Sequence, residues 1–223
     1  MCLGLAVVVG GFFALSKLVA FHPMRFQGKS AEEWREELSC GDAVRSNGAN
    51  AILLSTIIPG LSDAALHDTN DSRLKLVLAT ALNDLPGLRV TFLTAPARRG
   101  DAVKELGKFG PAAKAAIPVL DQILKGKDEA PRSAAATALG EIHSDPDVSI
   151  PALIACLEDS DINDQAAESL GKFGPLARAA VPKILPLLHG GKEARRAAKI
   201  ALPEIDPEAA AKAGLKTRKI KSP

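Results

Sequence analysis

The chain has 223 residues, 47% of them hydrophobic and 24% charged, which is enough for one or two domains with an apolar core. Its 28 Lys and Arg nearly balance 26 Asp and Glu, but the last twelve residues hold five basic residues and no acid. Three cysteines without a CxxC pair give neither a disulfide framework nor a zinc site. The short basic tail has no interleaved aromatic residues, so it is a weak signal of nucleic-acid binding.

The N-terminal segment, residues 2–21, is apolar and carries one charge, Lys17. About 20 such residues can cross a bilayer as a helix, so residues 1–22 are predicted to be a single transmembrane anchor or a signal segment. We favour a retained anchor because a basic start and an A-x-A cleavage site are both missing before His22. A cleaved signal, which would release the protein to the periplasm or medium, and a helix buried in protein are the alternatives. The side of the membrane on which the rest of the chain lies stays open.

Residues 28–94 are predicted to be degenerate or capping helical repeats. Ser30 and Glu33 have the spacing of a capping box, which predicts a helix that begins at about residue 31. Trp34 and Leu38 share one face of that helix. Because the ends of helical arrays need an atypical cap, we expect Trp34 to cover the open end of the array that follows.

Two further apolar helices are predicted in this region, over residues 51–58 and 73–85, and each ends at a Pro-Gly pair. Leu82 precedes Leu106 by only 24 residues, so the spacing of the units is broken here. We interpret the break as sequence drift. The alternative is a bend that forms a binding feature.

Residues 95–211 are predicted to be regular repeats. The hexapeptide LGKFGP occurs at residues 106–111 and 170–175, and related segments make the leading leucines recur after 33, 31 and 32 residues. A period near 32 with helical composition predicts an all-α fold, a short right-handed α-α superhelix (solenoid) of about five helical pairs that follows the N-terminal apolar helix. The positions that define the repeat are Leu106, Gly107, Leu139, Gly140, Leu170, Gly171, Leu202, Pro118, Pro151 and Pro182.

Each unit is expected to consist of two helices. An Ala-rich helix should end at Leu-Gly, because glycine tolerates the left-handed geometry of a helix end. The next helix should start near Pro118, Pro151 or Pro182, where proline fits a first turn; if it begins earlier, the proline kinks it. His143 stands where other units have glycine, which suggests a turn or cap residue.

The segment RSAAATALGEI at residues 132–142, both LGKFGP copies and the IPxL pattern after them resemble HEAT repeats, particularly the short, Ala-rich, phycobilisome-lyase-like repeats of bacterial proteins. The resemblance is clear over residues 95–210 and loose over 28–94. It implies a ladder of ion pairs in which an Arg of each unit pairs with an Asp of the preceding turn. Here Arg132 would pair with Asp128, and Asn163 would interrupt the ladder. Such repeats serve scaffolds, lyases and hydroxylases, so they define the fold better than the activity.

No catalytic, metal or cofactor site is predicted, because the four histidines are scattered and no His-x-x-x-His spacing occurs. Cys156 aligns with apolar positions and should lie in the core. The acidic run that includes Glu158 and Asp159 is interpreted as a solvated turn before a helix. Residues 212–223 are predicted to be a basic disordered tail.

The sequence therefore favours a non-catalytic, membrane-tethered scaffold that binds a protein partner and is not an enzyme. The partner should lie on the concave face formed by the second helices, with Arg132 and Lys172 as candidate contacts. One alternative is a phycobilisome-lyase-like enzyme that attaches a chromophore or another cofactor. A second alternative is binding of nucleic acid or anionic lipid through the basic tail, of which nucleic acid is the less expected partner.

Overall fold

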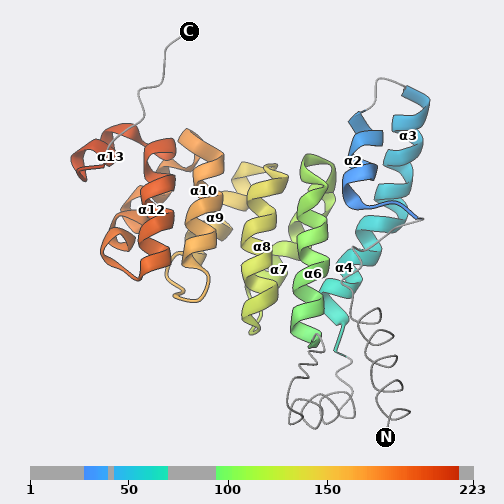
Figure 1. The fold of residues 1–223 in the computed structure, drawn as a ribbon, viewed down its shortest axis with the longest axis horizontal. Coiled ribbons are helices and arrows are strands. Elements are labelled where there is room, and N and C mark those ends of the chain that lie inside the picture. Colours follow the sequence, from blue (N-terminus) through green and yellow to red (C-terminus); the bar gives the residue numbers. More distant parts are fainter. Residues whose placement is uncertain (1–27, 40–42, 70–93, 216–223) are drawn as a thin grey trace, which may run out of the picture.

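The computed structural model describes residues 28–39, 43–69 and 94–215, and this part of the chain forms helices and no β-strand (Figure 1). The predicted anchor at residues 2–21 and the predicted helix at residues 73–85 lie outside the described residues. The elements, of which η1 is a π-helix and the other η segments are 3-10 helices, are α2 (Ala31–Ser39), α3 (Ala43–Ile52), η1 (Leu53–Ile57), α4 (Ile58–His67), α6 (Ala95–Lys108), η2 (Gly110–Ala116), α7 (Ile117–Leu124), α8 (Glu129–Ile142), α9 (Pro146–Cys156), α10 (Asn163–Phe173), η3 (Gly174–Ala180), α11 (Val181–Ile184), η4 (Leu185–His189), α12 (Lys192–Ile205) and α13 (Pro207–Lys212).

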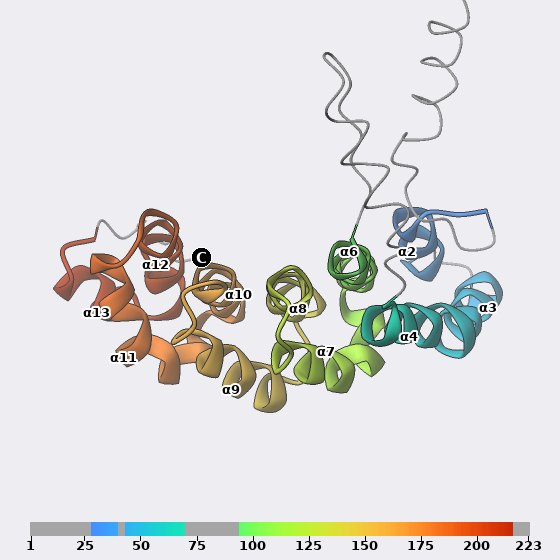
Figure 2. The ribbon, with the colours of Figure 1, turned by 90° about the horizontal axis from the view of Figure 1, so that it is seen from below.

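The helices are arranged in two layers. α6, α8, α10 and α12 lie side by side on the inner side of a curved array, and α4, α7, α9 and α11 form the outer layer (Figure 2). Each inner helix packs against the next inner helix along the chain. This arrangement is the all-α, HEAT-like solenoid predicted from the repeat.

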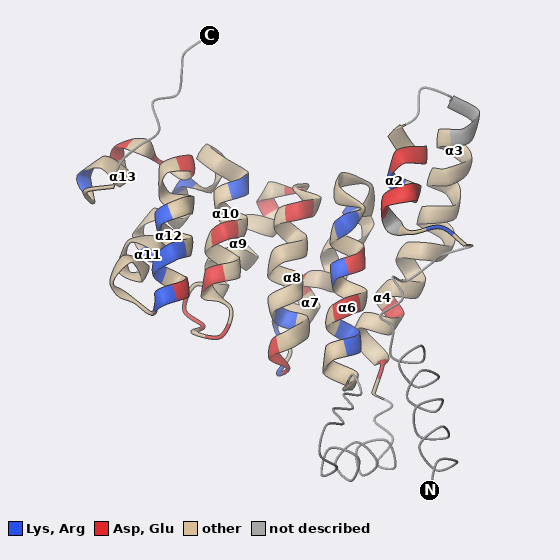
Figure 3. Ribbon diagram, in the orientation of Figure 1, with Lys and Arg blue, Asp and Glu red and all other residues tan. Residues whose placement is uncertain are grey.

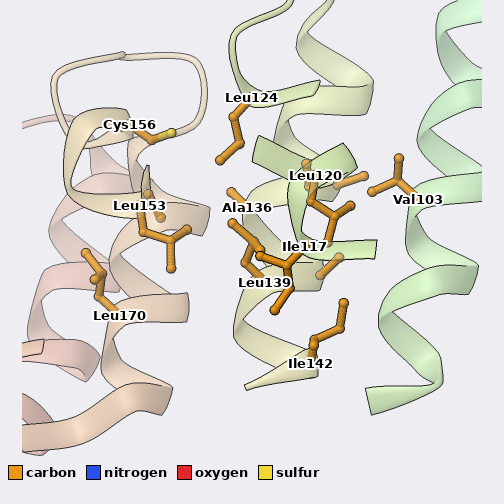
Figure 4. Close-up of a cluster of buried hydrophobic side chains, with 14 of the residues drawn as sticks. Val103, Ile117, Leu120, Leu124, Ala136, Leu139, Ile142, Leu153, Cys156 and Leu170 are labelled. Carbon is orange, nitrogen blue, oxygen red and sulfur yellow. The ribbon is translucent and has the colours of Figure 1, made fainter. Parts of the chain in front are cut away.

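One hydrophobic core runs between the layers through successive units. Figure 4 shows Ile117 and Leu120 of α7 pointing toward Leu139 and Ile142 of α8, all of them nearly inaccessible to solvent. The buried Cys156 belongs to the same cluster, as expected. Because every unit shares this core with its neighbours, stacking contributes most of the stability.

The helix at the N-terminal end forms as predicted. The Ser30 hydroxyl accepts a hydrogen bond from the Glu33 N–H at 3.2 Å, the Ser30 N–H donates to the Glu33 carboxylate at 2.5 Å, and α2 begins at the next residue. Trp34 is 2% exposed and belongs to the core. Lys108 of α6 lies 3.6 Å from Glu32, so α2 is fastened to the first inner helix.

The helix after α2 continues through a proline, which corrects the expectation that it ends there. Ile58 donates its N–H to the carbonyl of Leu53, five residues back, and Pro59, which has no N–H to donate, follows directly. The resulting helical stretch, Ser46–His67, is long and apolar enough to cross a membrane by length and composition. Its residues Leu53, Ile57 and Leu61 are buried in the solenoid core.

The glycines of the Leu-Gly pairs lie inside helices and do not end them, which corrects the second expectation. A methyl group on Gly140 of α8 would lie 2.9 Å from Cα of Ser169 on α10, and one on Gly171 would lie 3.0 Å from Cα of Ala201 on α12. Gly107 makes the same close approach to Ala138. These positions require glycine because neighbouring inner helices leave no room for a side chain.

The left-handed residue at the helix end comes three positions after these glycines. Gly110 and Gly174 each have φ 56°, and His143 has φ 48° at the corresponding position of the middle unit. His143 therefore takes the predicted cap role and ends α8. Its ring stacks on that of Phe173, with 4.7 Å between the centroids, and so links its unit to the next.

The three repeat prolines occupy two kinds of position. Pro118 and Pro182 lie in the first turn of α7 and α11, as predicted. Pro151 lies inside α9, because this helix begins earlier, at Pro146. The alternative of an earlier helix start therefore holds for the middle unit.

Candidate binding surface

The inner helices form the concave face on which a partner was predicted to lie. The inner helices α6, α8, α10 and α12 all carry both basic and acidic residues (Figure 3). Lys172 of α10 is exposed on this layer, whereas Arg132 of α8 has only 12% of its side chain exposed and forms an ion pair with Asp159. Of the two candidate contacts, Lys172 therefore presents its charge to solvent, and the charge of Arg132 is engaged within the protein. Partner binding by either residue stays a prediction.

A ladder of arginines and aspartates runs along one edge of the inner layer. Arg98 makes two hydrogen bonds to the Asp68 carboxylate, at 2.7 and 2.8 Å, and Arg99 donates to the Asp68 carbonyl and to the Asp128 carboxylate. Arg132 pairs with Asp159. Arg99 and Arg132 thus reach forward to a carboxylate in the turn of the next unit, whereas Arg98 binds Asp68, which precedes its own helix in the chain.

This direction corrects the expected pairing of Arg132 with Asp128, because Asp128 is bound by Arg99 of the unit before. It also corrects the interpretation of Asp159 as part of a solvated turn. Asn163 interrupts the ladder as expected. In the last unit Arg195 donates to the carbonyl of Gly190 at 3.0 Å instead of binding a carboxylate.

Within the described residues, no cluster of three or more His, Cys, Asp or Glu side chains that could hold a metal ion occurs. Burial raises the pKa of the Cys156 thiol, so this cysteine stays protonated near neutral pH. Glu158 forms an exposed ion pair with Lys183 at 2.7 Å, and the hydrogen bond from that lysine lowers the pKa of the carboxyl group.

A cavity of about 490 Å³, which we call the end cavity, lies at the C-terminal end of the solenoid. It was not predicted from the sequence. The walls come from α11 with η4, from α12 and from the residues after α13. The lining residues are Pro182, Leu185, Pro186, Leu188, His189, Lys199, Ala213 and Leu215.

The chain reaches this cavity through α13, which corrects the prediction that a disordered tail starts at residue 212. α13 extends to Lys212, whose ammonium group lies 2.9 Å from Glu208, and Leu215 packs against the core. Residues 216–223, with the other basic residues of the predicted tail, lie outside the described part. Lipid or nucleic-acid binding by the tail therefore stays a prediction.

Asp206 holds the start of α13 in a pH-dependent way. Its carboxylate accepts the N–H groups of Glu208 and Ala209, both at 3.0 Å, and the Ala209 hydrogen bond and the nearby Arg178 guanidinium lower its pKa below the usual 3.8. Replacing Asp206 with Ala should lower the thermal midpoint at pH 7 by a few degrees, as expected for a lost helix cap.

The sign of the pH effect follows from the lowered pKa. The stabilisation by Asp206 is present above the pKa of the unfolded chain and is lost as the pH falls through the lower folded pKa. Thermal scans of the wild type and Asp206→Ala should therefore differ at pH 7 and converge in strong acid. Asp147→Ala, at an exposed acid in the first turn of α9, serves as the control; a constant difference at all pH values would contradict the prediction.

The two layers, the ladder and the closely packed inner helices define an α-solenoid of the HEAT type. A family model described as HEAT repeats matches residues 93–171. The chain is 42% identical over 98 residues to a phycocyanobilin lyase subunit alpha from Synechococcus elongatus, a match that covers 40% of this chain and 34% of the relative. The matched part thus spans about a third of the relative's length.

A solved structure has the same fold. It is the complex of CpcE and CpcF of phycocyanin lyase from Nostoc sp. PCC7120, which matches with a TM-score of 0.52 and 22% sequence identity. The match covers 85% of this chain and 68% of the solved chain. At this identity the likeness shows the fold alone.

These similarities overturn two predictions. The interpretation as a non-catalytic scaffold is wrong, and so is the prediction that the chain is not an enzyme, because the relative identified by sequence is a subunit of a lyase. They favour the alternative stated above, a lyase-like protein that takes part in attaching a chromophore. The comparisons do not bear on the predicted anchor.

Proposed function

We propose that the chain is a HEAT-repeat subunit of a bilin lyase, which binds a linear tetrapyrrole and helps attach it to an acceptor protein. The observation that carries this proposal is the 42% identity to a phycocyanobilin lyase subunit alpha. The solenoid supports it, because stacked helical repeats supply a long curved surface on which a protein and a flat chromophore can both be held.

The role of the described residues is binding and orientation. Cys156, the cysteine among them, is buried with a raised pKa, so it is a poor nucleophile and a poor attachment point. We therefore assign the thiol that receives the chromophore to the acceptor protein. The subunit would increase the rate by holding the two reactants in a productive arrangement.

We further propose that the chain works with a second protein subunit. The solved structure that shares its fold is a complex of two chains, CpcE and CpcF. The exposed inner layer, including Lys172, is the surface that we assign to protein contacts. Arg132 is not included in this surface, because its guanidinium forms an ion pair with Asp159.

Titration of the full chain with phycocyanobilin tests the proposal. We expect a saturable change in visible absorbance and induced circular dichroism, together with faster attachment of the bilin to an acceptor apoprotein when the chain and its partner subunit are added. The same chain after heat denaturation is the control. Spectra that match free bilin at every protein concentration, with an unchanged attachment rate, would contradict the proposal.

A further inference from the structure

The end cavity has a lysine at a position that is apolar in the other units. Counted from the leading leucine of each repeat, Val103, Ala136 and Ala167 precede it by three residues and are fully buried between helices. Lys199 precedes Leu202 by the same three residues, is exposed and lines the end cavity. Within the described part of the chain no further inner helix follows α12, so this position stays open in the last unit and places the lysine at the edge of the cavity.

The rest of the cavity is an apolar surface left open at the end of the array. Leu188 corresponds to Leu124 and Leu157, which are buried in the preceding units, but Leu188 is only half-buried. α13 covers part of the last unit, with Ala210 fully buried, and the chain then returns along the cavity through Leu215. The result is a hollow with walls from three segments, of a volume typical of small-molecule sites.

The charge at the cavity is positive and unpaired. No acidic residue lines it, and within residues 28–39, 43–69 and 94–215 no carboxylate forms an ion pair with Lys199 or His189. α12 also carries Lys192, Arg195 and Arg196. An apolar hollow with a free cation suits an apolar molecule that bears a carboxylate.

We propose that the end cavity binds a carboxylate-bearing apolar small molecule and that Lys199 holds the carboxylate. This inference rests on the proposed function for the identity of the ligand, a linear tetrapyrrole whose propionate groups supply the negative charge. The apolar walls, chiefly Leu185, Leu188 and Leu215, would cover part of the ring system. Lys199 is thus a binding residue, and the inner layer stays free for proteins.

The test measures dissociation constants of the full-length chain for phycocyanobilin and for its dimethyl ester, in which both carboxylates are blocked. Lys199→Glu should weaken binding of the free acid at least tenfold, and Lys199→Arg should keep most of the affinity. The dimethyl ester should bind the wild type weakly and should be insensitive to Lys199→Glu. Lys125→Glu, which changes an exposed lysine at the end of α7, is the matched control and should bind both ligands as the wild type does.

Laurate, an apolar carboxylate that is not a bilin, separates this inference from the proposed function. Bilin binding that ignores Lys199→Glu would overturn the assignment of the cavity and leave the lyase proposal standing. Laurate binding that depends on Lys199, without any bilin binding, would support the carboxylate site and contradict the lyase proposal. If neither ligand shows a dependence on Lys199, or if Lys199→Glu changes only self-association in light scattering, the small-molecule site is wrong.

Discussion

Gly140→Ala should destabilise the protein by about 1–3 kcal/mol, the range found when a well-packed core is overfilled. The added methyl group would lie 2.6 Å from Oγ, 2.7 Å from Cβ and 2.9 Å from Cα of Ser169. Rotation of the serine side chain relieves only the first of these contacts. The backbone of α10 must therefore move away from α8, which loosens the core that the two units share.

Gly60→Ala is the matched control, because Gly60 also lies inside a helix and a methyl group there would meet nothing within 4 Å. This change should stabilise the protein by about 0.5–1 kcal/mol, since alanine restricts the unfolded chain more than glycine does. Urea unfolding followed by circular dichroism measures both variants. A Gly140→Ala protein as stable as the Gly60→Ala protein would show that the inner helices are not in close contact.

Asp159→Asn should destabilise the protein by about 1–3 kcal/mol, because it leaves the largely buried Arg132 without its carboxylate partner. Arg132 Nε is already buried without a hydrogen-bond partner, so little else compensates the guanidinium. Asparagine keeps an oxygen in the place where Asp159 accepts the Asp161 N–H at 3.0 Å, so the turn itself should survive. The decrease in the free energy of unfolding therefore measures the contribution of the Arg132–Asp159 pair.

Two further variants separate the ladder from general surface charge. Glu158→Gln removes the neighbouring exposed carboxylate and should change stability little. Arg132→Met in the Asp159→Asn background removes the unpaired buried charge and should recover part of the loss. Chemical unfolding of these three variants, the wild type and Arg132→Met alone completes the comparison; additive losses in the double variant would mean that Arg132 and Asp159 do not interact.

The repeat period made the fold predictable, because one pattern of leucine, glycine and proline occurs in three successive units and a fourth leucine continues the period. The role of the individual glycines was not predictable in the same way. A glycine near the end of a helical pattern fits a left-handed end and a close helix contact equally well, and only the spacing between α8 and α10 decides for Gly140. The cap role of His143 was predictable because its neighbours in register are glycines.

The candidate site was harder to predict, since its parts come from different units. The pairing of Arg132 with Asp159 depends on how the units stack, which a single-unit pattern does not contain. The end cavity depends on which surface is left uncovered after α13. Its one sequence signal was Lys199 in a position that is otherwise small and apolar.

The motifs alone favoured a scaffold, because the sequence holds no recognisable catalytic constellation. HEAT-type solenoids occur in both scaffolds and enzymes. An enzyme subunit that binds and orients reactants needs apolar surface and a few charges, which no short motif records. Similarity to a lyase subunit therefore bears more directly on the function than the absence of a motif does.

The gap in the ladder at Asn163 has a consequence for how ligand binding and folding are coupled. In the described part of the chain, the last unit is joined to the one before by apolar packing and by the exposed ion pair of Lys183 with Glu158, without a buried pair at that edge. The last unit can thus unfold at a lower free-energy cost than the middle of the array. A molecule in the end cavity would bind only the folded form of the last unit, so its binding would stabilise that unit. The fraction of molecules in which the last unit is folded would then rise with the ligand concentration.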